Sequence, residues 1–224
     1  MERPQFNIAA WMLLAIPSLA NAQMAGLVTY SEGTVTIDGE APAASPELHV
    51  LDGQDIAVVD GKAEMMLIPH TALRVGPQSS VEMVDAGFSS AHLKALSGTV
   101  VVDLPVSPGP DAIVVEATPY QVSFQRSGEY WMQKTESGWR VIVLKGQASI
   151  DGEGVSYKIK AKRASTLDGS QTVTKLGKGE EPDDAFAEWR RARGEKVRKA
   201  IPASMRDAKE KVHGLEQLRT MGTP

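Results

Sequence analysis

The chain has 224 residues, of which 42% are apolar and 23% charged, so it is long enough to form one large domain or two small ones with a substantial core. Its net charge of -4 argues against a nucleic-acid binder that works by bulk attraction. The absence of cysteine excludes disulfides, thiolate metal sites and cysteine nucleophiles.

Residues 1–22 have the features of a secretory signal peptide. The apolar run of residues 8–16 is followed by Pro17 and by Ala20, Asn21 and Ala22, the small-x-small pattern that a signal peptidase accepts. A membrane-spanning helix needs about 20 apolar residues, and this run is shorter. We therefore expect cleavage after Ala22 and a periplasmic or secreted mature protein without a transmembrane helix, with an uncleaved amino-terminal anchor as the alternative.

Residues 26–176 predict a series of β-strands. Apolar and polar residues alternate in segments such as "VTYSEGTVTIDGE", where Val35 and Ile37 are expected to face a core, and "VSYKIKAK", where Val155, Tyr157, Ile159 and Ala161 are expected to do so. Glycine, aspartate and proline separate these segments at short intervals. This pattern is typical of half-buried strands.

A proline-rich segment divides the β region. "PVSPGPD" at residues 105–111 contains three prolines and predicts a linker or wide loop. We therefore expect a β domain over residues 23–107 and a second β portion of the same domain over residues 108–176.

Three segments in this region are similar to one another. "GTVTIDG", "GTVVVDL" and "GQASIDG" begin at Gly33, Gly98 and Gly146, and each has an aspartate five residues later. Glycine permits a tight turn with positive φ, and aspartate suits the next turn. The similarity favours a strand-turn unit reused in a coiled or rolled β structure, although any all-β protein can show such similarities.

Residues 177–224 predict a basic helical tail. Acidic residues and Pro182 occur where a helix would begin, and one stripe is formed by Phe186, Trp189, Arg193 and Val197. Pro202 is expected to end this helix. A second helix is expected to begin with Ser204 and Asp207 as its cap and to bury the stripe Met205, Ala208, Val212, Leu215 and Leu218.

The tail has two interpretations. Between Trp189 and Lys211 there are nine lysines and arginines and three acidic residues, which suggests attraction to an acidic protein or peripheral contact with an anionic membrane surface. The candidate partner-binding residues are Trp189, Arg190, Arg191 and Arg193. In the other interpretation the charges form a solvated helix face, while the apolar stripe, with Trp189, packs on the β body.

The order of these parts resembles the FecR domain family of bacterial exported regulators. The resemblance covers about residues 26–193 and lies in "GTVTIDG", "DGQDIAVVDGKAEMML", "LRVGPQSSVEM", "LSGTVVVDLP", "VLKGQASIDGEGVSYKIKA" and the helix "FAEWRRAR". It implies an all-β fold, β-solenoid-like or rolled, followed by a C-terminal helical segment and without catalytic residues. Members sense signals in the periplasm and pass them to a sigma factor.

This sequence departs from that pattern in two respects. It shows no cytoplasmic anti-sigma segment and no transmembrane helix, and it has "SFQRSGEYWMQ" where the family has Gly-Thr before the aromatic strand. The resemblance therefore implies the fold and a binding role, and not sigma-factor regulation by this chain alone.

No residue pattern indicates catalysis, a metal site or a cofactor. The histidines His49, His70, His92 and His213 have no metal-ligand spacing. His70 with Ser79 or Ser80 lacks a nucleophile elbow. The aspartates Asp38, Asp103 and Asp151 are too far apart for a calcium loop and are interpreted as turn residues.

We therefore expect an exported, non-enzymatic FecR-like binding or scaffolding module of the periplasm or cell envelope, part of an envelope signal-sensing system. Its partner is expected to be a protein or an envelope polymer, and not nucleic acid. The alternative is a carbohydrate- or peptidoglycan-binding β module in which Tyr130, Trp131 and Trp139 stack on sugars.

Overall fold

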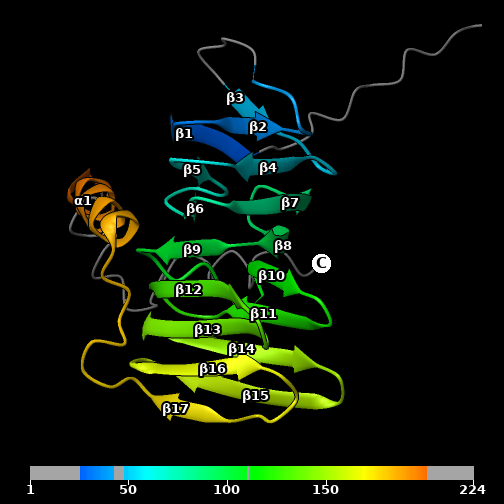
Figure 1. Ribbon diagram of the computed structural model, residues 1–224, viewed down its shortest axis with the longest axis vertical. Helices are drawn as coiled ribbons and strands as arrows, with labels where there is room; N and C mark the ends of the chain where they lie inside the picture. Colours follow the sequence, from blue (N-terminus) through cyan, green and yellow to red (C-terminus); the bar gives the residue numbers. More distant parts are fainter. Residues whose placement is uncertain (1–25, 43–47, 110, 201–224) are drawn as a thin grey trace, which may run out of the picture.

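A computed structural model describes residues 26–42, 48–109 and 111–200. The predicted signal peptide, His213 and the predicted second helix lie outside these residues. In the described part the chain forms two facing β-sheets and one helix, with the helix on the outer side of one sheet (Figure 1).

Sheet A carries the helix. Its spatial order is β17-β16-β13-β12-β9-β6-β5-β1-β3. Its strands are β1 (Gly26–Glu32), β3 (Leu48–Val50), β5 (Lys62–Met66), β6 (Ala72–Val75), β9 (Thr99–Leu104), β12 (Gly128–Thr135), β13 (Gly138–Lys145), β16 (Arg163–Leu167) and β17 (Val173–Lys175).

Sheet B lies opposite, in the order β15-β14-β11-β10-β8-β7-β4-β2. Its strands are β2 (Val35–Ile37), β4 (Asp55–Val58), β7 (Ser79–Ala86), β8 (Ala91–Ser97), β10 (Ile113–Ala117), β11 (Tyr120–Phe124), β14 (Gln147–Gly152) and β15 (Val155–Lys160). Figure 1 shows that the strands of both sheets follow one another along the long axis in nearly the order of the sequence.

The prediction of an all-β body followed by a helix is confirmed, but the structure does not support a solenoid. Parallel coils would pair strands of successive turns in parallel, whereas the described ladders are antiparallel except for β8 with β10. Beyond β5 the chain forms mostly antiparallel hairpins that alternate between the two sheets, such as β5–β6 and β7–β8.

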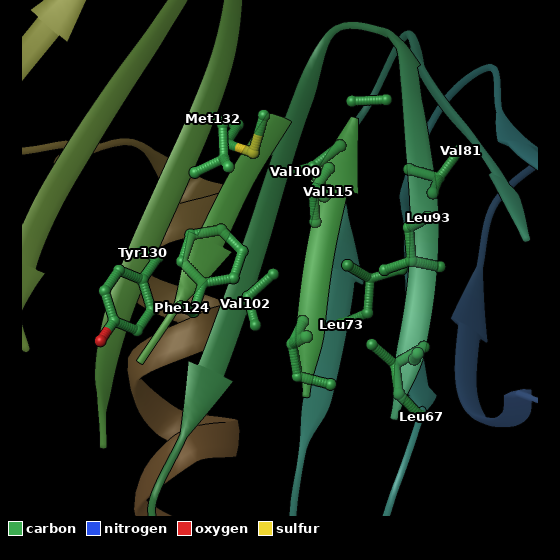
Figure 2. Packing of buried hydrophobic residues seen from close by; sticks show 14 of the residues in the cluster. Leu67, Leu73, Val81, Leu93, Val100, Val102, Val115, Phe124, Tyr130 and Met132 are labelled. Carbon is green, nitrogen blue, oxygen red and sulfur yellow. The ribbon is translucent and has the colours of Figure 1, made fainter. Parts of the chain in front are cut away.

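The main core fills the space between the sheets. Strand alternation sends Val100, Val102 and Tyr130 from sheet A toward Leu93 and Phe124 from sheet B, and all five are at most 1% exposed (Figure 2). The rings of Phe124 and Tyr130 lie 4.5 Å apart. The Pro-rich segment does not interrupt this core, because β9 precedes it, β12 follows it, and the two strands pair directly.

The three similar segments share a turn but not a position in the fold. Gly33, Gly98 and Gly146 all have positive φ, as predicted. However, Gly33 and Gly146 precede strands of sheet B, while Gly98 precedes β9 of sheet A. Of the three aspartates predicted to be turn residues, Asp38 lies in a turn, whereas Asp103 lies within β9 and Asp151 near the end of β14.

The helix α1 (Ala185–Ala200) begins later than residue 177, where the predicted helical tail starts. Asp184 caps it: its Oδ1 accepts a hydrogen bond of 2.8 Å from the Ala187 amide. The prediction that Ala161 faces the core together with Val155, Tyr157 and Ile159 of β15 was also wrong. Ala161 is exposed and follows the end of the strand.

Candidate functional site

The outer face of sheet A is where α1 packs, and strand register builds it. One row of paired residues crosses the sheet as Tyr30, Glu64, Arg74, Val101, Trp131, Ile142 and Ala164. The next row contains Ala72, Asp103, Glu129 and Lys145. Along the first row, the side chains are therefore polar or charged on β1, β5 and β6 and apolar on β9, β12, β13 and β16.

The apolar part of this face receives the first turns of α1. Phe186 meets Trp131 edge-on, with ring centroids 5.8 Å apart, and Ala187 is 1% exposed beside them. Trp189 stacks on Phe186 at 5.6 Å and contacts Tyr30 at 5.3 Å. Aromatic contacts of this kind fix the helix against the sheet.

The charged part of the face forms a buried ionic cluster. Arg74, which is fully buried, donates from Nε to Glu64 Oε2 at 2.7 Å and also pairs with Asp103. From α1, Arg190 pairs with Asp103 at 3.1 Å and with Glu129 at 2.7 Å, and Arg193 pairs with Glu64. Each of these carboxylates therefore accepts from arginine, and two helix residues complete the set.

The electrostatics of Glu64 reflect this arrangement. Burial raises the pKa of its carboxyl, but the hydrogen bond from Arg193 and the charge of Arg74 outweigh burial and lower the pKa below its ordinary value. Thr29 donates a further hydrogen bond of 2.9 Å to the same carboxylate. Glu64 is thus held in its ionised form.

Beside the cluster lies an open groove of about 990 Å³. Its floor includes Arg74, Asp103 and Glu129 of sheet A, one wall is the Arg190 side of α1, and the other comprises Lys145 and the segment 177–183 that leads to the helix. Grooves of this size suit a small ligand or a peptide segment.

The candidate partner-binding residues are all on α1, but they face different surroundings. Trp189 and Arg193 contact sheet A, and Arg190, which is 7% exposed, lies in the ionic cluster. Arg191 is exposed and pairs with Asp183 at the groove wall. Arg190 and Arg191 line the groove, whereas Trp189 and Arg193 hold the helix in place.

The aromatic residues considered for sugar stacking are buried. Tyr130, Trp131 and Trp139 are 0%, 1% and 3% exposed. Sugar-binding platforms need exposed rings, so these three residues offer no such surface. Of the residues considered for hydrolysis, His70 lines the groove, while the Ser79 hydroxyl bonds to the backbone of Pro77 and Thr99.

Glu64, Arg74 and Glu129 were not among the residues predicted to form a site. The available signal was a charged residue inside an otherwise apolar strand, as in "KAEMM" and "ALRV". Buried charges are nearly always paired, so each such residue predicts a partner. Only the register shows which strand and helix supply that partner.

Within the part of the chain that the structure describes, there is no cluster of three or more potential metal ligands. The same residues contain no helix long and apolar enough to cross a membrane.

The fold and groove define a class: a two-sheet β protein with a helix clamped on one sheet. No protein-family description and no curated protein matches this chain. Two crystal structures of a "putative anti-sigma factor" from Parabacteroides distasonis are similar to it, with 10% and 11% identity and a TM-score of 0.43 each. The alignments cover 55% of this chain and 59% of those chains.

Proposed function

We propose that this protein is an exported, non-enzymatic binding module of the cell envelope with a rolled, FecR-like β domain, and that it acts in an envelope signal-sensing system. Its partner binds in the groove between α1 and sheet A. The observation that supports this most directly is the groove of about 990 Å³, which residues of sheet A and of the docked helix α1 line together.

The chemistry of the groove favours binding over catalysis. A general acid or base works best with a pKa near the operating pH. Glu64, the most buried carboxylate of the adjoining cluster, has its pKa lowered, and Asp103 and Glu129 accept from arginines. Such carboxylates act as fixed charge partners that orient the arginines.

A capture experiment with envelope extract tests this function. The full exported chain is compared with Lys145→Gln/Lys178→Gln, which changes two exposed groove residues, and with Lys158→Gln/Lys160→Gln on β15 of sheet B as the control. None of the four lysines takes part in the contacts between α1 and sheet A, so all three proteins are expected to keep the helix docked. Deleting the tail would instead uncover Trp131 and create a sticky apolar surface.

We expect one set of envelope proteins to be retained by the parent chain and by the sheet B control, and lost with the groove variant. Equal recovery from all three would place the binding surface elsewhere.

Amino-terminal sequencing of the exported chain tests the predicted signal peptide. The first residue is expected to be Gln23, as cleavage after Ala22 requires.

A further inference from the structure

Two buried arginine groups along the groove have no partner. Arg74 Nη2 and Arg190 Nε make no hydrogen bond to any residue that the structure describes. Arg74 is fully buried, Arg190 is 7% exposed, and both line the groove. Buried donors without acceptors cost free energy, so both groups favour a ligand that brings acceptor oxygens.

The rim of the groove adds positive charge. Apart from Arg74, Arg190, Asp103 and Glu129 of the ionic cluster, five lysines or arginines and three acidic residues line the groove. Lys162, Arg191 and Arg198 pair with Glu181, Asp183 and Glu195, respectively. Lys145 and Lys178 form no ion pair with the described residues, and both are exposed.

The two acidic residues of the floor do not cancel this excess. Asp103 already faces Arg74 and Arg190, and Glu129 accepts from Arg190 and from the Trp131 indole at 3.3 Å. The charge left for a ligand is therefore that of Lys145 and Lys178, together with the unpaired guanidinium N–H groups of Arg74 and Arg190 in the same groove.

From this arrangement we propose that the groove binds an acidic peptide segment of a partner protein, with aspartate or glutamate carboxylates placed over the lysines and arginines. This inference rests on the proposed function and names the ligand of that same groove. Arginine is the residue best suited to carboxylate recognition, because its planar fork matches the two oxygens.

Shape favours a peptide over other anions. A flat bilayer surface would contact the exposed lysines of the rim but could not enter the groove. A single phosphate would fill only a small part of about 990 Å³ and could not contact both walls. An extended acidic segment can lie in the groove and present several carboxylates along it.

Binding of a fluorescein-labelled oligoglutamate peptide to the purified full chain tests the proposal by fluorescence anisotropy at low ionic strength. We expect saturable binding that weakens as salt is added, and no binding of an oligoglutamine peptide. Lys145→Gln/Lys178→Gln should weaken binding roughly fivefold or more, and the control Lys158→Gln/Lys160→Gln should leave it unchanged.

A second measurement locates the ligand. In nitrogen-15 spectra, the Nε signals of Arg74 and Arg190 should shift when the peptide is added, while that of Arg140, which does not line the groove, should not. Equal affinity of the groove and control variants, or unshifted arginine signals, would overturn the proposal.

Two further anions separate the ligand classes. Inorganic phosphate that displaces the peptide completely at similar concentration would show a small-anion site. Binding of vesicles of phosphatidylglycerol and phosphatidylcholine through Lys145 and Lys178, without peptide binding, would show a membrane site. Either of these two results would reject an acidic peptide as the ligand. If envelope partners are captured through the groove but no acidic peptide binds, only this inference fails and the proposed function stands.

Discussion

Arg74 is the central residue of the ionic cluster. It lies fully buried between Glu64 and Asp103, and it also lies 6.0 Å from the Trp189 ring. A buried ion pair contributes little compared with a well-packed apolar pair, but removing one partner leaves an uncompensated charge. The arginine is therefore more costly to remove than its own net contribution suggests.

We predict that Arg74→Met lowers the free energy of unfolding by about 3 kcal/mol, because Glu64 loses a buried partner. Urea denaturation followed by tryptophan fluorescence measures this. Arg198→Met is the control, since that arginine is about half exposed and its pair with Glu195 lies at the surface. Similar losses in both variants would show that burial does not set the energy of these pairs.

Glu64 gives the cluster a pH dependence. Its pKa is lower in the folded state than the ordinary value of 4.5, so the folded state binds its proton less readily than the unfolded chain. The stabilisation is therefore complete above the unfolded value and is lost as the pH falls toward the folded one.

We predict that the difference in unfolding free energy between the parent chain and Glu64→Gln is largest near neutral pH and decreases as the pH falls below 4.5. Urea titrations at a series of pH values, each on both proteins, measure it. A difference that stayed constant down to acid pH would mean that the Glu64 charge does not stabilise the fold.

At the level of elements, α1 is held by a small aromatic contact and by the ionic cluster. Phe186 is 6% exposed and fits over Gly76, where an added Cβ would lie 3.3 Å from its ring. Opposite it is Trp131. The helix therefore has aromatic anchors in its first turns, Phe186 and Trp189, and charged anchors at Arg190 and Arg193.

We predict that Phe186→Ala lowers the free energy needed to detach α1 by about 3 kcal/mol, as for other buried Phe→Ala changes. Trypsin cleavage within α1 should then be much faster, while the far-ultraviolet signal of the sheets is retained. Glu188→Ala, on the exposed side of the same helix, should leave the cleavage rate unchanged. A parallel loss of sheet signal would show that the helix and sheets unfold together.

At the level of the whole molecule, the two β portions share both sheets. Strand β9 pairs with β6 before the Pro-rich loop and with β12 after it, and β8 pairs with β10 across the same loop. Their side chains also share one core. Each portion alone would leave an open sheet edge and half of a core.

We predict a single unfolding transition for the β body. Fluorescence of Trp131 and Trp139, both in the second portion, should coincide with circular dichroism of all strands during urea unfolding. Two separate transitions would contradict this. Chains of residues 26–107 or 108–176 alone are expected to lack the cooperative transition of the parent.

The sequence predicted much of this architecture. Alternation in "VTYSEGTVTIDGE" placed Val35 in the core, glycine marked the positive-φ turns at Gly33, Gly98 and Gly146, and acidic residues preceded the helix. These features depend on neighbours within a few residues. They were therefore readable without knowing which strands pair.

The groove could not be predicted from neighbouring residues in this way. Asp103 looks like a turn residue in "GTVVVDL", and Glu64, Arg74 and Arg190 are separated by up to 126 positions, from Glu64 to Arg190, so that no local pattern links them. Their partnership depends on the strand register of sheet A and on where α1 lands. The tail's charge excess suggested a partner surface, but three of the four named residues, Trp189, Arg190 and Arg193, hold the helix against sheet A.

By itself, the sequence determined that this chain is a β body with a helix after it, because side-chain periodicity follows directly from strand and helix geometry. The tertiary structure decided which face of which sheet the helix covers, which charges become buried and paired, and where a groove with unpaired arginine groups remains. The reason is that pairing energies depend on contacts between residues far apart in the chain, and such contacts exist only once the sheets have set the register.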